Sequence, residues 1–527
     1  MSTKKFLASL MILPLLTFCG NKTNPDPEPG PGPEPQPQPT AVVNITSPTD
    51  FSFGCEGGSG TITFTSNVDW TLAADDAWVT LNPTSGKASD NAVNVTFTCE
   101  PNPKLKKRST YIVLSGYGVQ KNISVEEAGN PMSGAAAPFK SGDVLQANSL
   151  LTQEFLDEVN YPDWPDEDAQ NRTTKIFDYY GGFDGETLTW DNWETEWPDG
   201  DKPMAYSIQW AENVMDGSAM NLHMEDALGW SGDLEIAAGS RYVNITNLVP
   251  NDSYTYKVTT AGGATIAEGP FTTVGNLHHV FFSGDVQVKK GVEIKGEGGR
   301  NARDLGGWTG LDGKKIKYRK VYRGGRLNEK WKPYPLNLQG EKEVLFEGIG
   351  AELDLRGNDD VMFTSAVTIE GKELDHCAPV IEQGGKTMLV NDAAKTKECF
   401  EFVLASVRNN KPVYFHCSLG RDRTGTLSIL LMGLLGVREG DIAKEYELTY
   451  FAPVGYSVSS SDKKSNPKPT FHNTRLAWVY SDVVPYFWEK AQETTGKTFA
   501  EGVEKYLLDV AGVPQEDINE FRNLMLE

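Results

Sequence analysis

Residues Pro412 to Gly425 read PVYFHCSLGRDRTG, in which an apolar run ends at a cysteine and an arginine follows after five further residues. The segment 424–435 comes directly afterwards and is nearly all apolar, as a buried helix should be. Residues 411–415, which are apolar after Lys411, are the predicted central strand. A loop between a strand and a helix N-terminus aims several backbone N–H groups at one point, where the helix dipole adds positive potential.

The residues of this loop predict phosphoryl transfer. Positive potential at a helix N-terminus lowers the pKa of a thiol, which would make Cys417 a thiolate nucleophile. The planar guanidinium of Arg423 can bind two oxygens of one phosphate. The expected chemistry is transfer of a phosphoryl group to Cys417, followed by hydrolysis. The cysteine–arginine spacing alone also fits a buried strand-end thiol and a solvated arginine, but His416, Gly420 and Thr424 in their places favour the catalytic interpretation.

The whole string resembles the signature loop of cysteine-dependent tyrosine and dual-specificity phosphatases. It is similar in particular to the bacterial branch with His-Cys-x-x-Gly-Lys-Asp-Arg-Thr-Gly, which also includes phosphoinositide phosphatases. Arg421 stands where that branch usually has lysine. The resemblance covers most of residues 300–527. Its other motifs are NARDLGGW (301–308), DGKK (312–315), VYRGGR (321–326), AELDLR (351–356), LLGVREGDI (434–442) and GVPQEDI (512–518).

This resemblance implies a role for each residue of the loop. Cys417 attacks phosphorus, and Arg423 with the backbone amides of residues 418–423 stabilises charge on the phosphate oxygens. Thr424 can donate its hydroxyl to the Cys417 sulfur when that sulfur leaves, and His416 supports the loop. The residues expected to contact substrate are Ser418, Leu419, Gly420, Arg421, Thr424 and Asp354.

A leaving alkoxide also needs a proton, so a carboxylic acid must lie within reach. The resemblance makes Asp422, inside the loop, the first candidate for the general acid. Asp354 at the tip of a predicted strand is the second candidate, and Asp392 is the third. Arg421 could bind a second anionic group of the substrate, which would favour a phosphoinositide or an inositol phosphate over phosphotyrosine.

At 527 residues the chain is too long for a single core. We expect a multidomain protein with N-terminal β-sandwich modules followed by an α/β cysteine-phosphatase domain, whose central, mostly parallel sheet is flanked by helices. The formal net charge of -23 would repel nucleic acid, which is therefore not an expected partner. The basic segment 289–332 either suits an anionic substrate or is a solvated face. No cysteine–histidine cluster has zinc spacing, and we expect no metal and no cofactor.

Residues 1–19 resemble a bacterial lipoprotein signal peptide. Two lysines precede a short apolar core, and LTFCG at residues 16–20 resembles a lipoprotein box with Cys19 as the lipidated residue. Phe18 departs from the usual small residue, so an ordinary signal with an incidental cysteine is the alternative. Residues 20–40 form a proline-rich linker. We therefore expect a lipid-anchored protein of the cell envelope, at the outer membrane, in the periplasm or on the surface.

Residues 41–130 have short alternating strands separated by turn residues. Trp70, Trp78 and the NPTSG sequence that follows them resemble a BACON-type β-sandwich, a family often attached to carbohydrate-active enzymes. The tryptophans could contact a glycan, although such residues more often belong to a core. Cys55 and Cys99 could form a disulfide.

Residues 134–276 are predicted to form a second β domain. LVPNDSYTYKV (248–258) and GPFTT (269–273) resemble the last strands of a fibronectin type III sandwich with its tyrosine corner. The segment 142–184 matches no pattern. Tryptophans among carboxylates in this region could stack on sugars or anchor loops, namely Trp164, Trp190, Trp193 and Trp197.

Residues 280–527 are the predicted phosphatase-like domain, with a polar insertion at 457–468 that could be a lid. We predict an exported phosphatase that hydrolyses phosphomonoesters with phosphotyrosine or dual specificity. A phosphoinositide or inositol phosphate phosphatase is one alternative. The other is a catalytically weak surface lipoprotein that binds glycans or phosphate. The expected partners are a phosphorylated substrate and a membrane, with glycan contact by the β modules as a further possibility.

Overall fold

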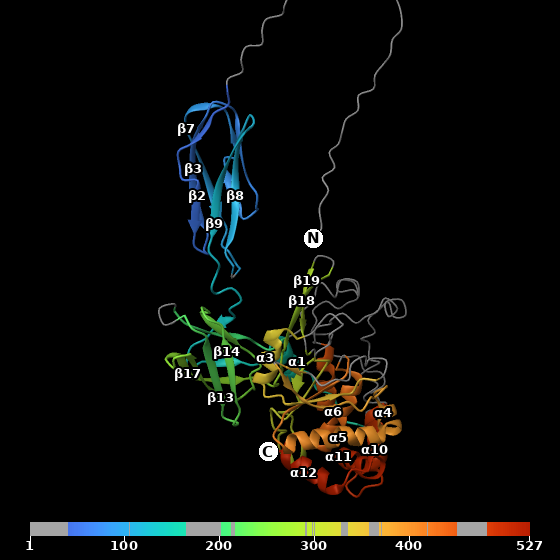
Figure 1. Cartoon of the computed structure of the whole chain (residues 1–527). Helices are drawn as coiled ribbons and strands as arrows, with labels where there is room; N and C mark the ends of the chain where they lie inside the picture. The colour runs from blue at the N-terminus through green and yellow to red at the C-terminus, as the bar shows by residue number, and fades with distance from the viewer. Residues whose placement is uncertain are drawn as a thin grey trace, which may run out of the picture. The chain divides into compact units, whose positions relative to one another are not determined.

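The computed structural model describes residues 40–104, 106–164, 202–211, 217–289, 292–297, 299, 301–327, 336–357, 368–369, 371–418, 420–450 and 482–527. These fall into two compact units, Met1–Asn130 and Pro131–Glu527 (Figure 1). The multidomain prediction, with a β-rich N-terminal region and a later domain of helices and sheets, is confirmed. The predicted signal peptide, the lipidation site Cys19 and the linker lie outside the described residues, as do Leu419, Trp190, Trp193, Trp197 and the insertion 457–468.

The first unit contains two β-sheets with a shared core of alternating side chains. One sheet has the strand order β1-β3-β7-β5 and the other has β2-β9-β8-β4-β6. Ile62, Phe97 and Ile112 are fully buried between them, as the period of two along a strand requires. The strands are β1 (Val43–Ile45), β2 (Asp50–Phe53), β3 (Gly58–Ser66), β4 (Trp70–Ala74), β5 (Val79–Asn82), β6 (Ser85–Gly86), β7 (Ser89–Cys99), β8 (Arg108–Gly116) and β9 (Val119–Glu127).

Four side chains singled out in the sequence of this unit are Trp70, Trp78, Cys55 and Cys99. Trp70 is 4% exposed and belongs to the core. The guanidinium carbon of Arg108 lies 4.2 Å from the centroid of the Trp78 ring, which it covers. Cys55 and Cys99 are free thiols, so the disulfide considered from the sequence does not form.

The β part of the second unit also has two sheets. The larger sheet has the order β11-β17-β16-β13-β14, and the smaller has β10-β12-β15. The Val249 backbone N–H donates to the Tyr254 hydroxyl oxygen at 2.8 Å, a local bond of the kind expected for a tyrosine corner. The fibronectin type III likeness itself stays a prediction. The strands are β10 (Ala137–Pro138), β11 (Val144–Gln146), β12 (Tyr206–Gln209), β13 (Met220–Asp226), β14 (Ser231–Ile236), β15 (Tyr242–Ile245), β16 (Ser253–Thr260) and β17 (Thr265–Val274).

The α/β part is built on a sheet with the order β20-β21-β26-β22-β25. Strand β20 is antiparallel to β21, whereas the pairs β21/β26, β26/β22 and β22/β25 are parallel. The central strand β26 is fully buried, as its apolar sequence requires. The strands are β20 (Arg303–Asp304), β21 (Val321–Gly324), β22 (Ala351–Asp354), β25 (Asp375–Cys377) and β26 (Val413–His416), with the separate pairs β18 (Ser283–Lys289) and β19 (Val292–Glu297), and β23 (Thr368–Ile369) and β24 (Lys372–Glu373).

Helices surround this sheet (Figure 1). Helix α5 packs against β22 and β26, and α6 packs against β21 and β26. Nearly every side chain of α6 is buried, which explains its continuously apolar sequence. The helices are α3 (Leu338–Phe346), α4 (Lys386–Asn391), α5 (Ala393–Arg408), α6 (Asp422–Leu434), α7 (Glu439–Glu447), α10 (Val484–Ala491), α11 (Phe499–Tyr506) and α12 (Gln515–Met525), with the short segments η4 (Leu311–Gly313), η5 (Leu448–Tyr450) and η7 (Leu507–Ala511).

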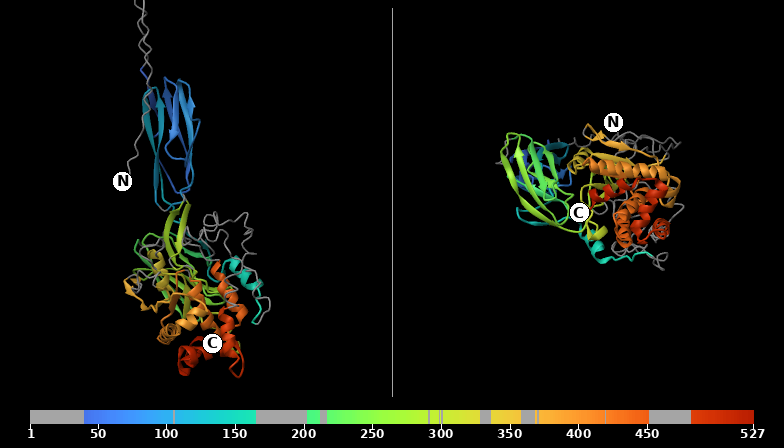
Figure 2. Two further views of the ribbon diagram at one scale, coloured as in Figure 1. Left: turned by 90° about the vertical axis from the view of Figure 1, so that its right-hand side faces the viewer. Right: turned by 90° about the horizontal axis from the view of Figure 1, so that it is seen from below.

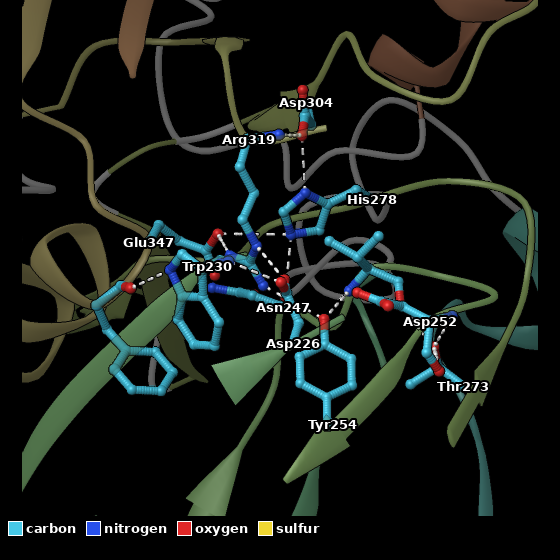
Figure 3. Close-up of polar contacts among 12 residues, drawn as sticks. Asp226, Trp230, Asn247, Asp252, Tyr254, Thr273, His278, Asp304, Arg319 and Glu347 are labelled. Carbon is cyan, nitrogen blue, oxygen red and sulfur yellow. Dashed lines mark hydrogen bonds and ion pairs between the residues drawn. The ribbon is translucent and has the colours of Figure 1, made fainter. Parts of the chain in front are cut away.

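A buried polar network joins the β part of the second unit to the α/β part (Figure 3). Arg319, just before β21, pairs through Nη1 with Glu347 and through Nε with Asp226 of β13 at 3.3 Å. The Arg319 backbone N–H donates to Asp304 Oδ2 at 2.5 Å, and His278 Nδ1 lies 2.9 Å from the same oxygen. The two parts are therefore tied at the amino end of β21.

A second contact between these parts comes from an unexpected place in the sequence. Helix α1 (Leu150–Glu158) and the residues up to Trp164 precede the strand β12, yet they form hydrogen bonds with α7 of the α/β part and with Arg438 just before it. In both views of Figure 2, this turquoise segment lies beside orange parts of the chain. We call residues 150–164 the strap. They fall within the segment that matched no sequence pattern. None of the helices among the described residues is long and apolar enough to cross a membrane.

Candidate active site

The predicted loop connects the carboxyl end of β26 to the amino end of α6. His416 is the last residue of β26 and Asp422 is the first of α6. Cys417 is 3% exposed and stands at the edge where the parallel strands β21, β26 and β22 end. In α/β sheets this carboxyl edge is the usual place for ligands. The sequence prediction of strand, loop and helix is therefore confirmed.

Gly420 makes the tight turn of the loop possible. Its φ is +68°, and a Cβ atom there would lie 2.3 Å from the carbonyl carbon of Gly324 and 2.5 Å from the amide nitrogen of Gly325. Both are backbone atoms at the end of β21, which cannot move aside as a flexible side chain could. The close approach of the two backbones therefore requires glycine at this position.

The pKa of the Cys417 thiol is shifted in the opposite direction to that of the other cysteines in the described residues. Burial raises the pKa of the Cys99 thiol to about 11 and that of Cys377 to about 12, and the pKa values of Cys55 and Cys399 are raised as well. Burial also acts to raise the pKa of Cys417. The positive charge of Arg423 and hydrogen bonds from the hydroxyl and amide of Thr424 outweigh it, and this pKa lies below the ordinary value of 9.0.

Contacts with a neighbouring loop orient the start of α6. Arg423 donates through Nη1 to the Ile381 carbonyl at 3.0 Å. The Thr426 hydroxyl donates to the Asp422 carbonyl at 3.0 Å and accepts the Gly385 N–H at 2.7 Å. The Thr424 hydroxyl has no nitrogen or oxygen partner among the described residues. It is therefore available for the Cys417 sulfur.

His416 holds the loop from the β22 side. Its Nε2 lies 2.8 Å from Glu352 Oε1, and its Nδ1 lies 3.3 Å from the Cys417 carbonyl oxygen and 3.9 Å from Asp354 Oδ1. Burial lowers the pKa of His416, but the Asp354 charge and the Glu352 hydrogen bond outweigh burial and raise it. The supporting role of His416 stays a prediction.

Asp354 is a buried ion-pair partner. It is 2% exposed, and both of its carboxylate oxygens accept hydrogen bonds from Arg356 at 2.7–3.0 Å. Burial acts to raise the pKa of Asp354, but the charges of His416 and Arg356 outweigh burial and lower it. A carboxylate held ionised in this way is poorly suited to donate a proton. Asp392, the third candidate, lies between α4 and α5 and pairs with Lys395 at 2.9 Å.

Asp422 and Arg421 lie side by side at the mouth of the loop. Arg421 contacts the two carboxylate oxygens of Asp422 through Nε and Nη2, each at 3.3 Å. The side chain of Asp422 is 31% exposed and that of Arg421 is 26% exposed. Both groups can therefore reach a molecule in solvent, which the buried Asp354 cannot. Ser418 of the same loop is half-buried.

Two buried arginines support the loop from behind. Arg323 of β21 donates through Nη2 to the Gly420 carbonyl, which also accepts a hydrogen bond from Asn301 at 2.9 Å. Arg323 Nη1 lies 2.7 Å from Glu445 Oε2, and Arg303 Nε lies 2.6 Å from Glu445 Oε1. The sequence motifs at 301–308 and 321–326 marked these residues, but their spacing did not reveal their place behind the loop. Glu445 on α7 belonged to no motif.

Comparisons with known proteins bear on this site. Residues 294–527 match the model of the tyrosine phosphatase family. A Cupriavidus necator protein named "Putative tyrosine-protein phosphatase" is 25% identical over 168 residues, which cover 28% of this chain and 59% of that protein. The chain thus spans less than two thirds of the length of this relative. The predicted resemblance to tyrosine phosphatases is confirmed.

The first unit has a family match of its own. Residues 68–126 match the model of the BACON domain, described as "Putative binding domain, N-terminal", which confirms that prediction. Among solved structures, a Bacteroides ovatus GH5 xyloglucanase is similar at 17% identity over 20% of this chain and 22% of its own, with a TM-score of 0.16. A Bacteroides thetaiotaomicron protein is similar at 10% identity over 16% of this chain and 84% of its own, with a TM-score of 0.12. Likenesses at this level carry no argument about function.

The part of the chain that matches the tyrosine phosphatase family model brings most of the predicted site residues together. Cys417, Gly420, Arg421, Asp422, Arg423 and Thr424 lie on one loop and the first turn of one helix. His416 and Asp354 lie on adjacent strands, paired in register. Within the described residues, no group of three histidine, cysteine or carboxylate side chains could hold a metal ion. The chemistry available here is that of a thiol, an arginine, a hydroxyl and a carboxylate.

Proposed function

We propose that the chain is an exported cysteine-dependent phosphatase that hydrolyses phosphomonoesters through a phosphoryl-Cys417 intermediate. The observation that carries the proposal is the lowered pKa of a buried thiol at the amino end of α6, where burial raises the pKa of the other described buried thiols. A low pKa and a helix N-terminus are the usual means of activating a cysteine nucleophile. The tyrosine phosphatase family match over the same residues supports the same chemistry.

In the first step, the Cys417 sulfur attacks phosphorus, an S–P bond forms and the bond from phosphorus to the leaving oxygen breaks. The electron pair of that bond goes to the leaving oxygen, which takes a proton from Asp422. Arg423 and the amides of the loop stabilise the charge on the three remaining phosphate oxygens. The contact of Arg423 with the Ile381 carbonyl fixes the direction of the guanidinium before substrate arrives.

In the second step, water attacks the phosphorus of phosphoryl-Cys417 and gives a proton to the Asp422 carboxylate. The S–P bond breaks, its electron pair returns to sulfur and inorganic phosphate is released. The Thr424 hydroxyl, which lacks a nitrogen or oxygen partner among the described residues, donates to the departing sulfur. Donation to the thiolate lowers its basicity and makes it a better leaving group.

Exposure favours Asp422 over Asp354 as the general acid. Asp422 lies beside the thiol loop on the first turn of α6 with 31% of its side chain exposed, whereas Asp354 is buried under Arg356. Asp422 must part from Arg421 to reach a leaving group, because Arg421 contacts both of its oxygens. A second anion on the substrate could draw Arg421 away. Binding of such a substrate would therefore also separate the Asp422 carboxyl group from Arg421.

The nucleophile is tested with Cys417→Ser and a matched control, Cys99→Ser. Cys99 is also buried, and its pKa of about 11 leaves it as a thiol at neutral pH. We expect Cys417→Ser to abolish turnover of p-nitrophenyl phosphate while it still binds tungstate, and Cys99→Ser to keep full turnover. Turnover retained by Cys417→Ser would reject the proposal. Vanadate-sensitive hydrolysis by the unaltered protein separates an enzyme from a protein that only binds phosphate.

The substrate proposal is a phosphomonoester on a protein, with a phosphoinositide or an inositol phosphate as the alternative. Arg421, which stands where the resembled branch usually has lysine, decides between them, since its side chain is 26% exposed and can contact a second anionic group. A panel of phosphotyrosine, phosphoserine, phosphoinositides and inositol phosphates, measured with the unaltered protein and Arg421→Ala, gives the test. A loss confined to substrates with two or more phosphates supports the inositol class. An equal loss on phosphotyrosine contradicts it.

Export and anchoring are proposed from residues 1–40 alone, with Cys19 as the lipidated residue. Labelling with a radioactive fatty acid in the native host, with Cys19→Ser as the control, is the measurement. Label on the unaltered protein and none on Cys19→Ser would support the anchor. Absence of label on both would contradict it. For the β modules, the buried Trp70 and the covered Trp78 give no support to a sugar-binding platform.

A further inference from the structure

Helix α7 lies between the strap and the loop 417–423, which is called the phosphate-binding loop below. Its residues Glu445 and Glu447 are 1% and 0% exposed, and they make charged contacts in two different directions. Glu445 pairs with the arginines behind the loop, and Glu447 accepts a hydrogen bond from Tyr161 of the strap. Fully buried carboxylates are rare unless they are paired, so both contacts contribute to where α7 sits.

The contact toward the loop runs through Glu445 and Arg323. Each carboxylate oxygen of Glu445 binds one arginine, Arg303 at 2.6 Å and Arg323 at 2.7 Å, and the Glu445 carbonyl accepts a third bond from Arg303 at 2.8 Å. Arg323 then donates to the Gly420 carbonyl. In a trans peptide, the C=O and the following N–H point in opposite directions. The bond from Arg323 holds the Gly420 carbonyl toward the two buried arginines. The next N–H along the chain, that of Arg421, therefore points away from them.

The contact toward the strap involves residues along the length of α7, as well as Arg438 just before it. Arg438 donates to the Tyr161 carbonyl at 3.0 Å, the Gly440 N–H donates to Asp163 Oδ1 at 3.0 Å, and Lys444 donates to the Leu156 carbonyl at 3.2 Å. A Cβ at Gly440 would lie 2.1 Å from the Tyr161 carbonyl oxygen. The strap thus lies directly on the helix backbone.

We propose that Glu445 is a positioning residue for the phosphate-binding loop and that the strap, which lies outside the family match at 294–527, sets the position of the helix that carries it. The proposal rests on the function proposed above, because it assigns the Gly420–Arg421 peptide to phosphate binding. Removal of the Glu445 charge would leave Arg303 and Arg323 as two adjacent buried cations. Their mutual repulsion would move Arg323 from the Gly420 carbonyl.

Glu445→Gln is compared with Glu347→Gln, a closely matched control. Glu347 is also 1% exposed and is paired with a buried arginine, Arg319 (Figure 3). Arg319 lies before β21, whereas the backbone of Gly324 at the other end of β21 lies close to the loop. The readout is the dissociation constant of tungstate, together with the pH dependence of Cys417 alkylation. We expect Glu445→Gln to raise the dissociation constant of tungstate by about tenfold. Glu347→Gln should raise it by less than about threefold, although both variants lose a similar amount of stability. Equal weakening in both variants, or none in Glu445→Gln, would overturn the role of Glu445.

The strap is tested with Tyr161→Phe and its matched control Tyr506→Phe. Both changes remove one buried hydroxyl. The Tyr506 hydroxyl donates to the Leu389 carbonyl and, among the described residues, makes no hydrogen bond to α7 or to the loop. We expect Tyr161→Phe to weaken tungstate binding. In the double variant with Glu445→Gln, the two effects on tungstate affinity should not be additive. Tungstate affinity unchanged by Tyr161→Phe, or additive effects, would contradict the role of the strap.

These measurements remain informative if the proposed function fails. Tungstate binding and Cys417 alkylation need no turnover, so they report loop geometry even in a protein that hydrolyses nothing. If the unaltered protein binds tungstate but, in separate assays without tungstate, hydrolyses none of the substrates, the phosphatase is rejected and the positioning role is still measurable. Normal hydrolysis with no difference between Glu445→Gln and Glu347→Gln would reject the positioning role and leave the phosphatase intact.

Discussion

Replacing Gly420 with alanine tests whether the close contact between two backbones sets the loop geometry. The added Cβ would lie 2.3 Å from the Gly324 carbonyl carbon, 2.4 Å from its oxygen and 2.5 Å from the Gly325 nitrogen. Non-bonded carbon atoms need roughly 3.5 Å. The loop or the end of β21 must therefore move by roughly 1 Å, and no flexible side chain can yield in their place.

This displacement predicts a large loss of activity with a modest loss of stability. A shift of about 1 Å at a catalytic site can reduce the rate by about 100-fold. The positive φ of +68° adds about 1–2 kcal/mol of backbone strain, because alanine rarely adopts this conformation. We expect kcat/KM for p-nitrophenyl phosphate to fall by about 100-fold or more, and the Cys417 thiol to become less readily alkylated at neutral pH.

Gly512→Ala is the matched control. Gly512 also has a positive φ, +74°, but a Cβ there would meet no atom within 4 Å. This variant should lose about 1–2 kcal/mol of unfolding free energy, measured by urea denaturation, and keep its kcat/KM. If Gly420→Ala retained near-normal kcat/KM, or if both variants lost activity in proportion to stability, the argument from backbone contact would be wrong.

Three further predictions follow from the charges around the loop. Asp422→Asn should lower kcat with phenyl phosphate by about 100-fold and have a small effect with a substrate whose leaving group needs no proton, whereas equal losses would remove Asp422 as the acid. The rate of Cys417 alkylation by iodoacetamide should reach half its maximum at a pH below 9.0, and Arg423→Ala should move that midpoint upward, since the arginine charge opposes the effect of burial; an unchanged midpoint would contradict this. His416 has a raised pKa in the folded protein, so its ionic contribution to stability is complete below the ordinary value of 6.5 and is lost as pH rises through the raised value. The difference in unfolding free energy between the unaltered protein and His416→Asn should therefore shrink with rising pH, and a constant difference would show that His416 is not charged.

The central strand and helix could be predicted from sequence because their patterns are local. Apart from Lys411, residues 411–415 and 424–435 are uncharged and mostly apolar, and the structure has β26 at Val413–His416 and α6 at Asp422–Leu434. The predicted helix 392–409 corresponds to α5, Ala393–Arg408, whose buried residues recur at helical spacing. The loop between β26 and α6 is short, so the thiol and the arginine could be placed together as well.

Contacts between distant segments could not be predicted in this way. Glu445 lies on an amphipathic helix with no motif of its own, and only the fold brings it to Arg303 and Arg323, more than a hundred residues earlier in the chain. Tyr161 and Glu447 are separated by 286 residues, and the sequence around Tyr161 has no periodic pattern from which this contact could be predicted. Asp354 was proposed from its place at a strand tip, which is correct, but only the structure shows Arg356 covering both of its oxygens.

The central claim is that phosphate passes through Cys417. Its most direct test is rapid quenching of the protein during turnover of a radiolabelled phenyl phosphate, followed by digestion and identification of the labelled peptide. The account predicts one phosphoryl group on the peptide that contains Cys417, and no label in Cys417→Ser. Label on another residue, or none on a protein that is turning over, would contradict it.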